Sequence, residues 1–473
     1  MFSITTTAKS LWRFQIVLRS FLQQPGLPFS DALSEQQIEQ AFVDAGITCD
    51  DDHDVVYTPA VTLWAFLSQM LYSGAQRSCV AAVARVAVLW VTLGRKICDG
   101  NTGAYCRARH KLTEEVLQRL TCEVADTCEQ QVRGDWLWRS RHVWLVDGTT
   151  VSMPDTPKNQ AVYPQPTTQA PGVGFPLLRL VTMLSLSTGM LRDVALGPYA
   201  GKESGETALL RQLLARLRPG DVVLADRYYC GWFLLVLLRE LQVDVVVRLH
   251  QRREANFRRG QRLGKGDHLV EWPRPEKPDW MDDATYERMP ASLRVREVEV
   301  RIEEAGFRTQ SLVIVTTLTE VQEYPCEALA ELYHQRWLVE LDIRSIKSTL
   351  SLDVLRCKTP EMVHKELRTG LLAYNLIRQT MLQAALAAGC SPRELSFTAA
   401  LQMLAAVGLT VTLLDGELAI LIELHHVQVA SHRVGNRPGR VEPRAVKRRP
   451  KPHDLLTEPR DVARARLLSR KTT

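Results

Sequence analysis

An α/β fold is predicted for the central part of this chain by three observations. Short apolar runs that are typical of buried strands alternate with helical segments between about residues 143 and 250. Two of these runs, Val143–Val146 and Asp221–Ala225, are each followed directly by an aspartate, Asp147 and Asp226. A later stretch, Leu332–Leu350, lacks Gly and Pro and has apolar residues at helical spacing, so it is expected to be an amphipathic helix.

The composition is that of a globular protein with an ample core. The chain has 473 residues, of which 45% are hydrophobic and 24% charged, and this length invites two to four domains. We find neither an apolar run of membrane-spanning length nor an export signal at the start, so a cytoplasmic protein is expected. The ten Cys are scattered without a C-x-x-C pair, which favours reduced thiols over a zinc site.

The charge is distributed unevenly. The net charge of the whole chain is +6, but from Arg433 to the end thirteen Lys and Arg stand against four acidic residues, a net charge of +9. A basic tail on a mildly acidic body is the pattern expected of a protein that binds a polyanion. Pro and Arg dominate this tail, so it is expected to be an extended, largely disordered arm.

In chain order, we expect five regions. Residues 1–135 are mostly helical, and the basic stretch Asn101–Lys111 within them is either a DNA contact or a solvated turn. Residues 140–250 hold the first strands and helices, including a hairpin formed by Leu177–Leu186 and Gly189–Leu196. Residues 251–322 read as a β-rich insertion, 323–415 as helices, and 416–473 as the C-terminal segment with the basic arm.

The predicted helix at Leu332–Leu350 places four polar residues on one face. At roughly 100° per residue, they fall within an arc of about 60° beside the apolar stripe; they are Tyr333, Arg336, Glu340 and Lys347. An ordinary i, i+4 ion pair between Arg336 and Glu340 is one interpretation. The other is that Glu340 is a catalytic carboxylate flanked by groups that bind phosphates.

Asp147, Asp226 and Glu340 together offer hard oxygen ligands. Such ligands suit Mg²⁺ or Mn²⁺. Two such ions about 4 Å apart can activate a hydroxyl on one side of a phosphodiester and stabilise the leaving oxygen on the other. The constellation therefore favours phosphoryl transfer on nucleic acid, although a single aspartate after a strand is more often a turn or capping residue.

These residues resemble a known family. Asp147 in DGTT, Asp226 in DRYY, and Tyr333-x2-Arg336-x3-Glu340-x6-Lys347 are similar to the DDE triad and Y-R-E-K signature of the insertion sequence 4 family of bacterial transposases. The similarity extends over most of the chain, from YTPAVTLWAFLSQ at 57–69 to the KRRPKPHDLLTEPR tail. It implies a ribonuclease H-like catalytic core with a β-strand insertion, a helical N-terminal domain that binds DNA ends, and a basic C-terminal tail.

The resemblance also implies cut-and-paste transposition of double-stranded DNA by a homodimer, with Mg²⁺, or Mn²⁺ in its place, held by Asp147, Asp226 and Glu340. Excision through a hairpin intermediate would need a base turned out of the stack against an aromatic ring. Trp272 and Trp280 are candidates for that ring, but either could equally be a core residue of the insertion. Phosphate contacts are expected from Tyr333, Arg336 and Lys347; further DNA contacts are expected from Arg227, Arg448 and Arg449.

Two other functions fit the same residues. A transposase-derived protein that binds DNA without cutting it is one, although the intact triad argues against it; a nuclease that cuts but never joins strands is the other. Two further motifs carry little weight. The Gly197–Lys202 segment is one residue short of a phosphate-binding loop, and His425-His426 lacks a third metal ligand nearby.

Overall fold

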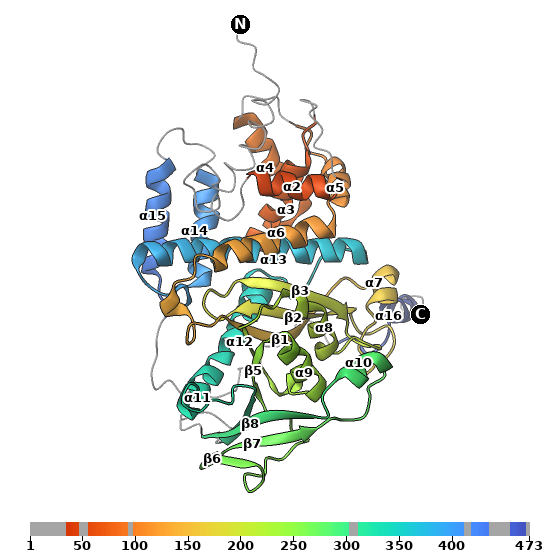
Figure 1. The fold of residues 1–473 in the computed structure, drawn as a ribbon. Helices are drawn as coiled ribbons and strands as arrows, with labels where there is room; N and C mark the ends of the chain where they lie inside the picture. The colour runs from red at the N-terminus through yellow and green to blue at the C-terminus, as the bar shows by residue number, and fades with distance from the viewer. Residues whose placement is uncertain are drawn as a thin grey trace.

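The computed structural model describes residues 35–46, 55–92, 98–301, 311–410, 418–434 and 455–469. Figure 1 shows helices gathered above a large, twisted sheet, with the long helix α13 lying between the two. The central α/β prediction is confirmed. In the described part of the chain, no helix is both long and apolar enough to cross a membrane.

One mixed sheet runs through the α/β part, and its nine described strands follow the order β3-β2-β1-β4-β5-β9-β8-β7-β6. Strand β4 is parallel to β1 and β5 is parallel to β4, whereas the other neighbours are antiparallel. The strands are β1 (Val143–Ser152), β2 (Leu177–Ser185), β3 (Leu191–Pro198), β4 (Val222–Ala225), β5 (Asp244–Arg248), β6 (Gln261–Gly264), β7 (Asp267–Pro273), β8 (Ser292–Arg301) and β9 (Ser311–Thr316).

Helices cover both faces of this sheet. Alternate residues of β1 show the division, because Val143 and Leu145 join the core shared with α13, whereas Trp144 and Val146 join the core shared with α8 and α9. The helices of the α/β part are α7 (Pro157–Val162), α8 (Glu206–Leu213), α9 (Trp232–Glu240), α10 (Asp283–Arg288), α11 (Cys326–His334), α12 (Leu338–Arg344) and α13 (Pro360–Ala388).

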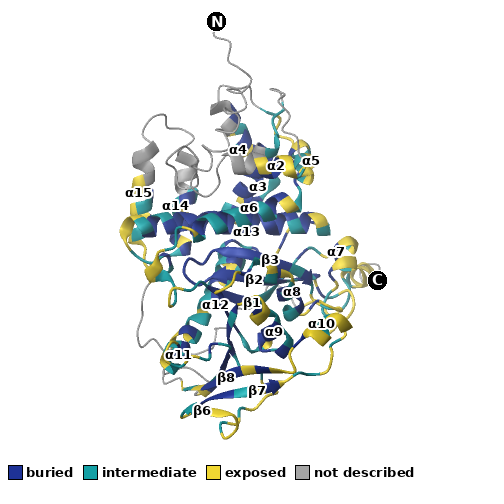
Figure 2. Ribbon diagram, viewed as in Figure 1, coloured by how far each residue is buried: buried dark blue, intermediate teal, exposed yellow. Residues whose placement is uncertain are grey.

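The N-terminal region is helical in its described parts, and it packs on α13 through α3 and α6. Its helices are α2 (Glu35–Asp44), α3 (Pro59–Leu71), α4 (Cys79–Thr92), α5 (Thr102–Lys111) and α6 (Glu114–Glu129). Near the C-terminus, α14 (Phe397–Thr410) and α15 (Leu418–Ser431) also pack on α13. Figure 2 shows α13 buried along most of its length, so it joins the helical region to the sheet.

Two expectations from the sequence need correction. Strand β1 does not end before Asp147 but continues to Ser152, because pairing with β2 carries it through the unfavourable Asp147-Gly148 step into the strand-favouring TTV residues. The helix predicted at 332–350 is interrupted by a 3₁₀ turn, Gln335–Trp337, and ends in a π-turn, Ser345–Thr349. Within their described length, residues 323–415 hold helices and no strand, as expected.

The basic arm differs partly from its prediction. Residues 435–454, with Arg448 and Arg449, lie outside the described residues. Beyond them, Arg460–Ser469 form helix α16 rather than extended chain. No Pro follows Pro459 in this segment, so the backbone hydrogen bonds of a helix can form.

Candidate active site

Asp147 and Asp226 lie next to each other where the parallel pairing of β1 and β4 ends. The register pairs Val146 with Ala225, and the two aspartates are the next residues on each strand. Neighbouring strands are about 4.8 Å apart, so their carboxylates share one edge of the sheet. The two strand-end aspartates singled out in the sequence are therefore brought together by the fold.

Burial and charge act strongly on Asp147. The pKa of Asp147 is raised to about 6, mainly by burial and also by the negative charges of Glu206 and Asp226, whereas the Gly148 N–H and the Arg336 guanidinium oppose the rise. The Gly148 amide donates to Asp147 Oδ1 over 2.8 Å. Like charges gathered in a half-buried site favour the protonated acid unless a cation joins them.

Glu340 approaches from α12, which packs against β1. Arg336 Nη2 donates to Glu340 Oε1 over 3.0 Å, and the side chains are 20% and 45% exposed respectively. The same guanidinium acts electrostatically on Asp147 and Asp226. Arg336 is thus the positive centre around which the three acids of the predicted triad lie, and the predicted i, i+4 ion pair is present as well.

The other two signature residues are held differently. Tyr333 is largely buried, and burial raises its pKa to about 12, with Arg336 opposing and Asp226 adding to the shift. Lys347 Nζ donates to Thr149 Oγ1 over 3.1 Å and to the Thr150 carbonyl over 2.7 Å. Lys347 therefore ties the end of the helical segment to β1, two and three residues beyond Asp147.

Sequence reasoning missed several residues at this site. Glu206, in the first turn of α8, accepts a 3.3 Å hydrogen bond from the Tyr229 hydroxyl. Its carboxylate lies against Gly148, since a Cβ built at that glycine would stand only 2.3 Å from Glu206 Cδ. Gly148 therefore leaves room for a fourth acid beside the aspartates. Nothing in the GKESGET segment alone signals this, because the contact depends on how α8 packs on the sheet.

Two exposed aromatic rings also flank the acids. Trp337 lies in the 3₁₀ turn between Tyr333 and Glu340 with 54% of its surface exposed, and Tyr228, two residues after Asp226, is 65% exposed. Single exposed apolar side chains are common on protein surfaces, so the exposure of these two rings alone does not indicate binding. The sequence could have indicated these two rings through their positions next to the signature residues.

The two tryptophans predicted as base-stacking candidates differ in access. Trp272 is only 4% exposed, its Nε1 donates to Glu297 over 3.0 Å, and Arg253 covers its ring at 4.1 Å, so it fits the insertion-core interpretation. Trp280 is 37% exposed and is stacked by Arg211, 3.8 Å from its ring centre. Arg227 is half-buried, and its guanidinium donates to Gln251 over 3.2 Å.

The donor chemistry of the site fits a divalent cation. The acids provide only oxygen ligands, which Mg²⁺ and Mn²⁺ prefer, and a cation between them would relieve the repulsion that raises the Asp147 pKa. Among the described residues, however, no three His, Cys, Asp or Glu side chains are arranged as a ready-made metal cluster. Glu340 is paired with Arg336 instead.

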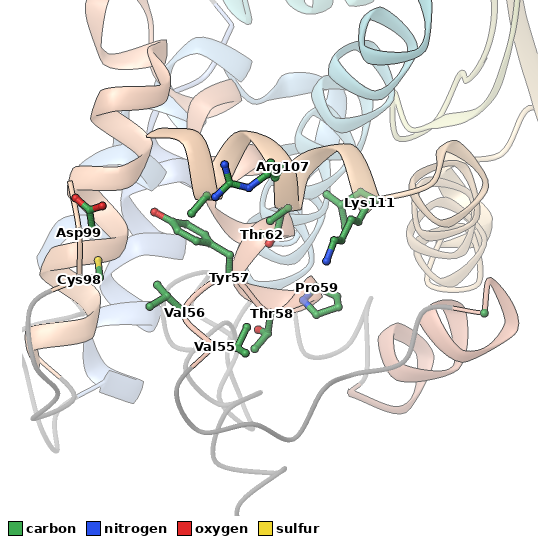
Figure 3. A pocket seen from close by; sticks show the side chains of 14 residues that line it. Val55, Val56, Tyr57, Thr58, Pro59, Thr62, Cys98, Asp99, Arg107 and Lys111 are labelled. Carbon is green, nitrogen blue, oxygen red and sulfur yellow. The ribbon is translucent and has the colours of Figure 1, made fainter. Parts of the chain in front are cut away.

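A separate pocket of about 680 Å³ lies in the N-terminal helical region (Figure 3). Arg107 and Lys111, one turn apart on α5, line it opposite Tyr57 and Thr58. Arg109, from the same basic stretch, instead stacks on the Phe66 ring at 4.8 Å and donates to Gln69. Only part of the Asn101–Lys111 stretch thus faces this cavity.

Comparisons with known proteins identify a transposase domain in this chain. Residues 138–376 match the family model described as the transposase DDE domain. The chain is 28% identical over 356 residues to the transposase InsG for insertion sequence element IS4 of Escherichia coli K12, covering 73% of this chain and 76% of that protein. It is 39% identical over 84 residues to the putative transposase InsL of element IS186A, covering 18% and 21% of the two chains.

Among solved structures, the chain resembles the piggyBac transposase synaptic complex with hairpin DNA. The TM-score is 0.43 at 8% identity, with 92% of this chain and 88% of that chain covered.

Proposed function

Since this chain belongs to the DDE transposases, within the insertion sequence 4 family, we propose that it cleaves DNA at the ends of a mobile element and joins those ends to target DNA in a metal-dependent reaction. One observation carries the proposal. Asp147 and Asp226 follow paired residues of β1 and β4, and Arg336, in the 3₁₀ turn before α12, acts electrostatically on both while it pairs with Glu340 of α12.

A ribonuclease H-like core is part of this proposal. Its support is the sheet order β3-β2-β1-β4-β5, in which three antiparallel strands are extended by two parallel ones and helices cover both faces. Strands β6 to β9 continue the same sheet, so the proposed insertion at 251–322 would lengthen the core sheet rather than form a separate body.

Asp147, Asp226 and Glu340 would hold Mg²⁺, with Mn²⁺ able to replace it. When bound, such ions activate the attacking hydroxyl and stabilise the leaving oxygen of the phosphodiester. The protein's own part is to gather the carboxylates at one sheet edge and to keep Arg336 beside them. Once Glu340 serves as a ligand, the Arg336 guanidinium is free to contact a phosphate, which it can do through two parallel hydrogen bonds.

Tyr333 and Lys347 complete the proposed phosphate-binding face. Lys347 has a second role in this proposal, because its bonds to Thr149 and Thr150 align the helical segment with the strand that carries Asp147. Hairpin formation during excision is the proposed route, and of the two predicted rings Trp280 has the better access to a base.

DNA is proposed to run from the site along a basic rim. The chain between β5 and β7 carries six Arg and Lys against one acid; they are Arg252, Arg253, Arg258, Arg259, Arg262 and Lys265, against Glu254. It begins just after Arg248, whose charge acts on Tyr333. Positive charge placed beside the acids favours a polyanionic substrate and makes binding salt-dependent.

The remaining assignments complete the proposal. Residues 1–135 would read the terminal inverted repeats, the basic C-terminal arm with Arg448 and Arg449 would contact DNA, and two copies would hold the two ends together. Such an enzyme would work in the bacterial cytoplasm, on the nucleoid.

The test is cleavage and joining of DNA that carries the inverted repeats flanking the gene, with Mg²⁺ or Mn²⁺. Native protein is compared with Glu340→Ala and with Glu331→Gln, a matched change at an exposed acid of α11. Excision and joined products that vanish only in Glu340→Ala, while DNA binding persists, are expected. Cleavage without joining would indicate a nuclease, binding alone a silent DNA-binding protein, and normal cleavage by Glu340→Ala would refute the proposal.

A further inference from the structure

Helix α12 carries a second acid, Asp342, in a very different setting from Glu340. Asp342 is 1% exposed. Its Oδ1 accepts a hydrogen bond from Arg378 of α13, and Arg393 Nη1 donates to both carboxylate oxygens over 2.8 Å. Asp342, Arg378 and Arg393 are called here the Asp342 cluster.

The Asp342 cluster lies behind the helix relative to the active site. Two residues along an α-helix turn the side-chain direction by about 200°, so Asp342 and Glu340 point to opposite faces. The exposures agree, since Glu340 is 45% exposed while Asp342 is enclosed. A contact that fixes Asp342 therefore also fixes the direction in which Glu340 points.

The cluster is anchored to the strand pair that carries Asp147. Arg393 also donates to the main-chain oxygens of Ser185 and Leu186, at the end of β2. Strand β2 pairs with β1 from Ser185 opposite Trp144 to Leu177 opposite Ser152. Asp342, Arg393, β2 and β1 thus form a continuous connection from the back of α12 to the strand of Asp147.

The helix has particular need of such an anchor. It is only seven residues long, and it is flanked by the 3₁₀ turn Gln335–Trp337 and the π-turn Ser345–Thr349. These irregular turns interrupt the regular hydrogen bonding that would otherwise set its rotation from its neighbours. Apolar packing of Val339 and Ile346 is non-directional, whereas the hydrogen bonds that the Arg393 guanidinium donates to Asp342 and to main-chain oxygens are directional.

We propose that Asp342 is a positioning residue, whose bonds to Arg378 and Arg393 fix the rotation of α12 and thereby hold Glu340 toward Asp147 and Asp226. The inference rests on the proposed function, in which Glu340 is a metal ligand. Loss of these bonds would then weaken metal binding in addition to any loss of stability.

The experiment measures Mn²⁺ binding by electron paramagnetic resonance, Mn²⁺-dependent cleavage, and DNA binding without metal. The variants are Asp342→Asn, Glu340→Gln and the control Glu331→Gln, each checked for folding by circular dichroism. For Asp342→Asn we expect a ~10-fold or larger rise in the half-saturating Mn²⁺ concentration in both titrations, the size typical of residues that orient metal ligands. DNA binding should stay at the native level, and excess Mn²⁺ should restore most of the cleavage.

A folded Asp342→Asn that melts earlier but keeps the native Mn²⁺ half-saturation, while Glu340→Gln loses Mn²⁺ binding, would overturn the inference and leave the proposed function standing. If Glu340→Gln binds Mn²⁺ normally, the proposed function and the inference both fail. Should Asp342→Asn not fold, Arg393→Lys decides, because it keeps the charge but loses the bonds from Nε and Nη2 to the Leu186 and Ser185 carbonyls. The same shift in Mn²⁺ half-saturation supports the inference, and its absence refutes it.

Discussion

The two faces of α12 handle buried charge in opposite ways. On the front, Asp147, Asp226 and Glu340 gather around the single guanidinium of Arg336, and the pKa of Asp147 rises to about 6 through burial and neighbouring acids. On the back, one carboxylate, Asp342, has two guanidinium groups and is almost fully enclosed. The back is compensated by the protein itself, whereas the front has an excess of negative charge that a cation from solution would balance.

This difference in charge balance distinguishes a ligand-binding cluster from a structural cluster more clearly than the burial of the residues does. Both faces contain acids and arginines, and both lie beside the same sheet. An excess of like charge is costly to folding, so its presence at the front indicates a ligand, whereas a balanced cluster indicates a role in holding the helix. Substitutions at the front should therefore change chemistry and those at the back should change stability or geometry.

The largest expected effect is at the front. Asp226→Asn should reduce the rate of strand cleavage by ~10³-fold or more, since loss of a metal ligand removes several kcal/mol of transition-state stabilisation. Gel assays of end cleavage in Mg²⁺ provide the measurement, with Glu331→Gln as the control. A variant within tenfold of the native rate would remove Asp226 from the metal site.

The next effect is at the back. Arg378→Met leaves the enclosed Asp342 with Arg393 alone, and the free energy of unfolding should fall by about 3–5 kcal/mol, the usual cost of removing one partner of a buried ion pair. Urea unfolding followed by circular dichroism measures this. A loss below about 1 kcal/mol, the range of exposed pairs, would mean that the cluster does not hold the helix.

The pH dependence of stability should differ with and without metal. The pKa of Asp147 is about 6 in the folded chain against an ordinary 3.8, so the folded state binds more protons between these values and stability falls as the pH rises from about 4 to 6. The loss is at most about 3 kcal/mol, because each unit of pKa is worth about 1.4 kcal/mol. Asp147→Asn should remove this loss.

Mg²⁺ should flatten the same slope, since a cation favours the charged carboxylate. Melting temperatures of native protein and Asp147→Asn, measured from pH 4 to 7 with and without Mg²⁺, test both statements. If stability changes with pH equally in the two proteins, the pKa of Asp147 is not raised in the folded state. Glu114 shifts in the opposite direction, because His364 and Arg368 outweigh burial and lower its pKa to about 2. Its contribution to stability rises with pH up to about 5, and since it is the same in both proteins it cancels in the comparison with Asp147→Asn.

The smallest effect concerns the ion pair at the front. Arg336→Met should change the free energy of unfolding by less than about 1 kcal/mol. The reason is that the Arg336–Glu340 pair is partly exposed, so water screens the attraction between the two charges. Cleavage should nevertheless fall, since Arg336 is proposed to contact phosphate. Urea unfolding and cleavage assays on one preparation separate the two effects. A stability loss as large as that of Arg378→Met would show that the two faces of α12 do not differ in their contribution to stability.

Much of the fold and the three central acids could be predicted from the sequence. The runs VWLV and DVVLA indicate buried strands, and the spacing around Glu340 indicates a helix, because both patterns repeat within a few residues and depend on local geometry. The hairpin of β2 and β3 was predicted for the same reason. Local patterns failed at DGTTVS, where pairing with β2 carries the strand through Asp147-Gly148, and at Arg460–Ser469, where a charged tail forms a helix.

The sequence by itself thus determined which residue types meet the requirements of metal-dependent phosphoryl transfer, and that they follow strands and a helix. Only the tertiary structure decided how they are held. Glu206 enters the site because α8 packs on the sheet beside Gly148, Lys347 bonds to Thr149 across 198 positions, and Asp342 is enclosed by arginines from α13 and beyond. The physical reason is that the protonation state and hydrogen bonds of a side chain depend on partners far away in the sequence, whereas sequence periodicity reflects only the local geometry of a helix or strand.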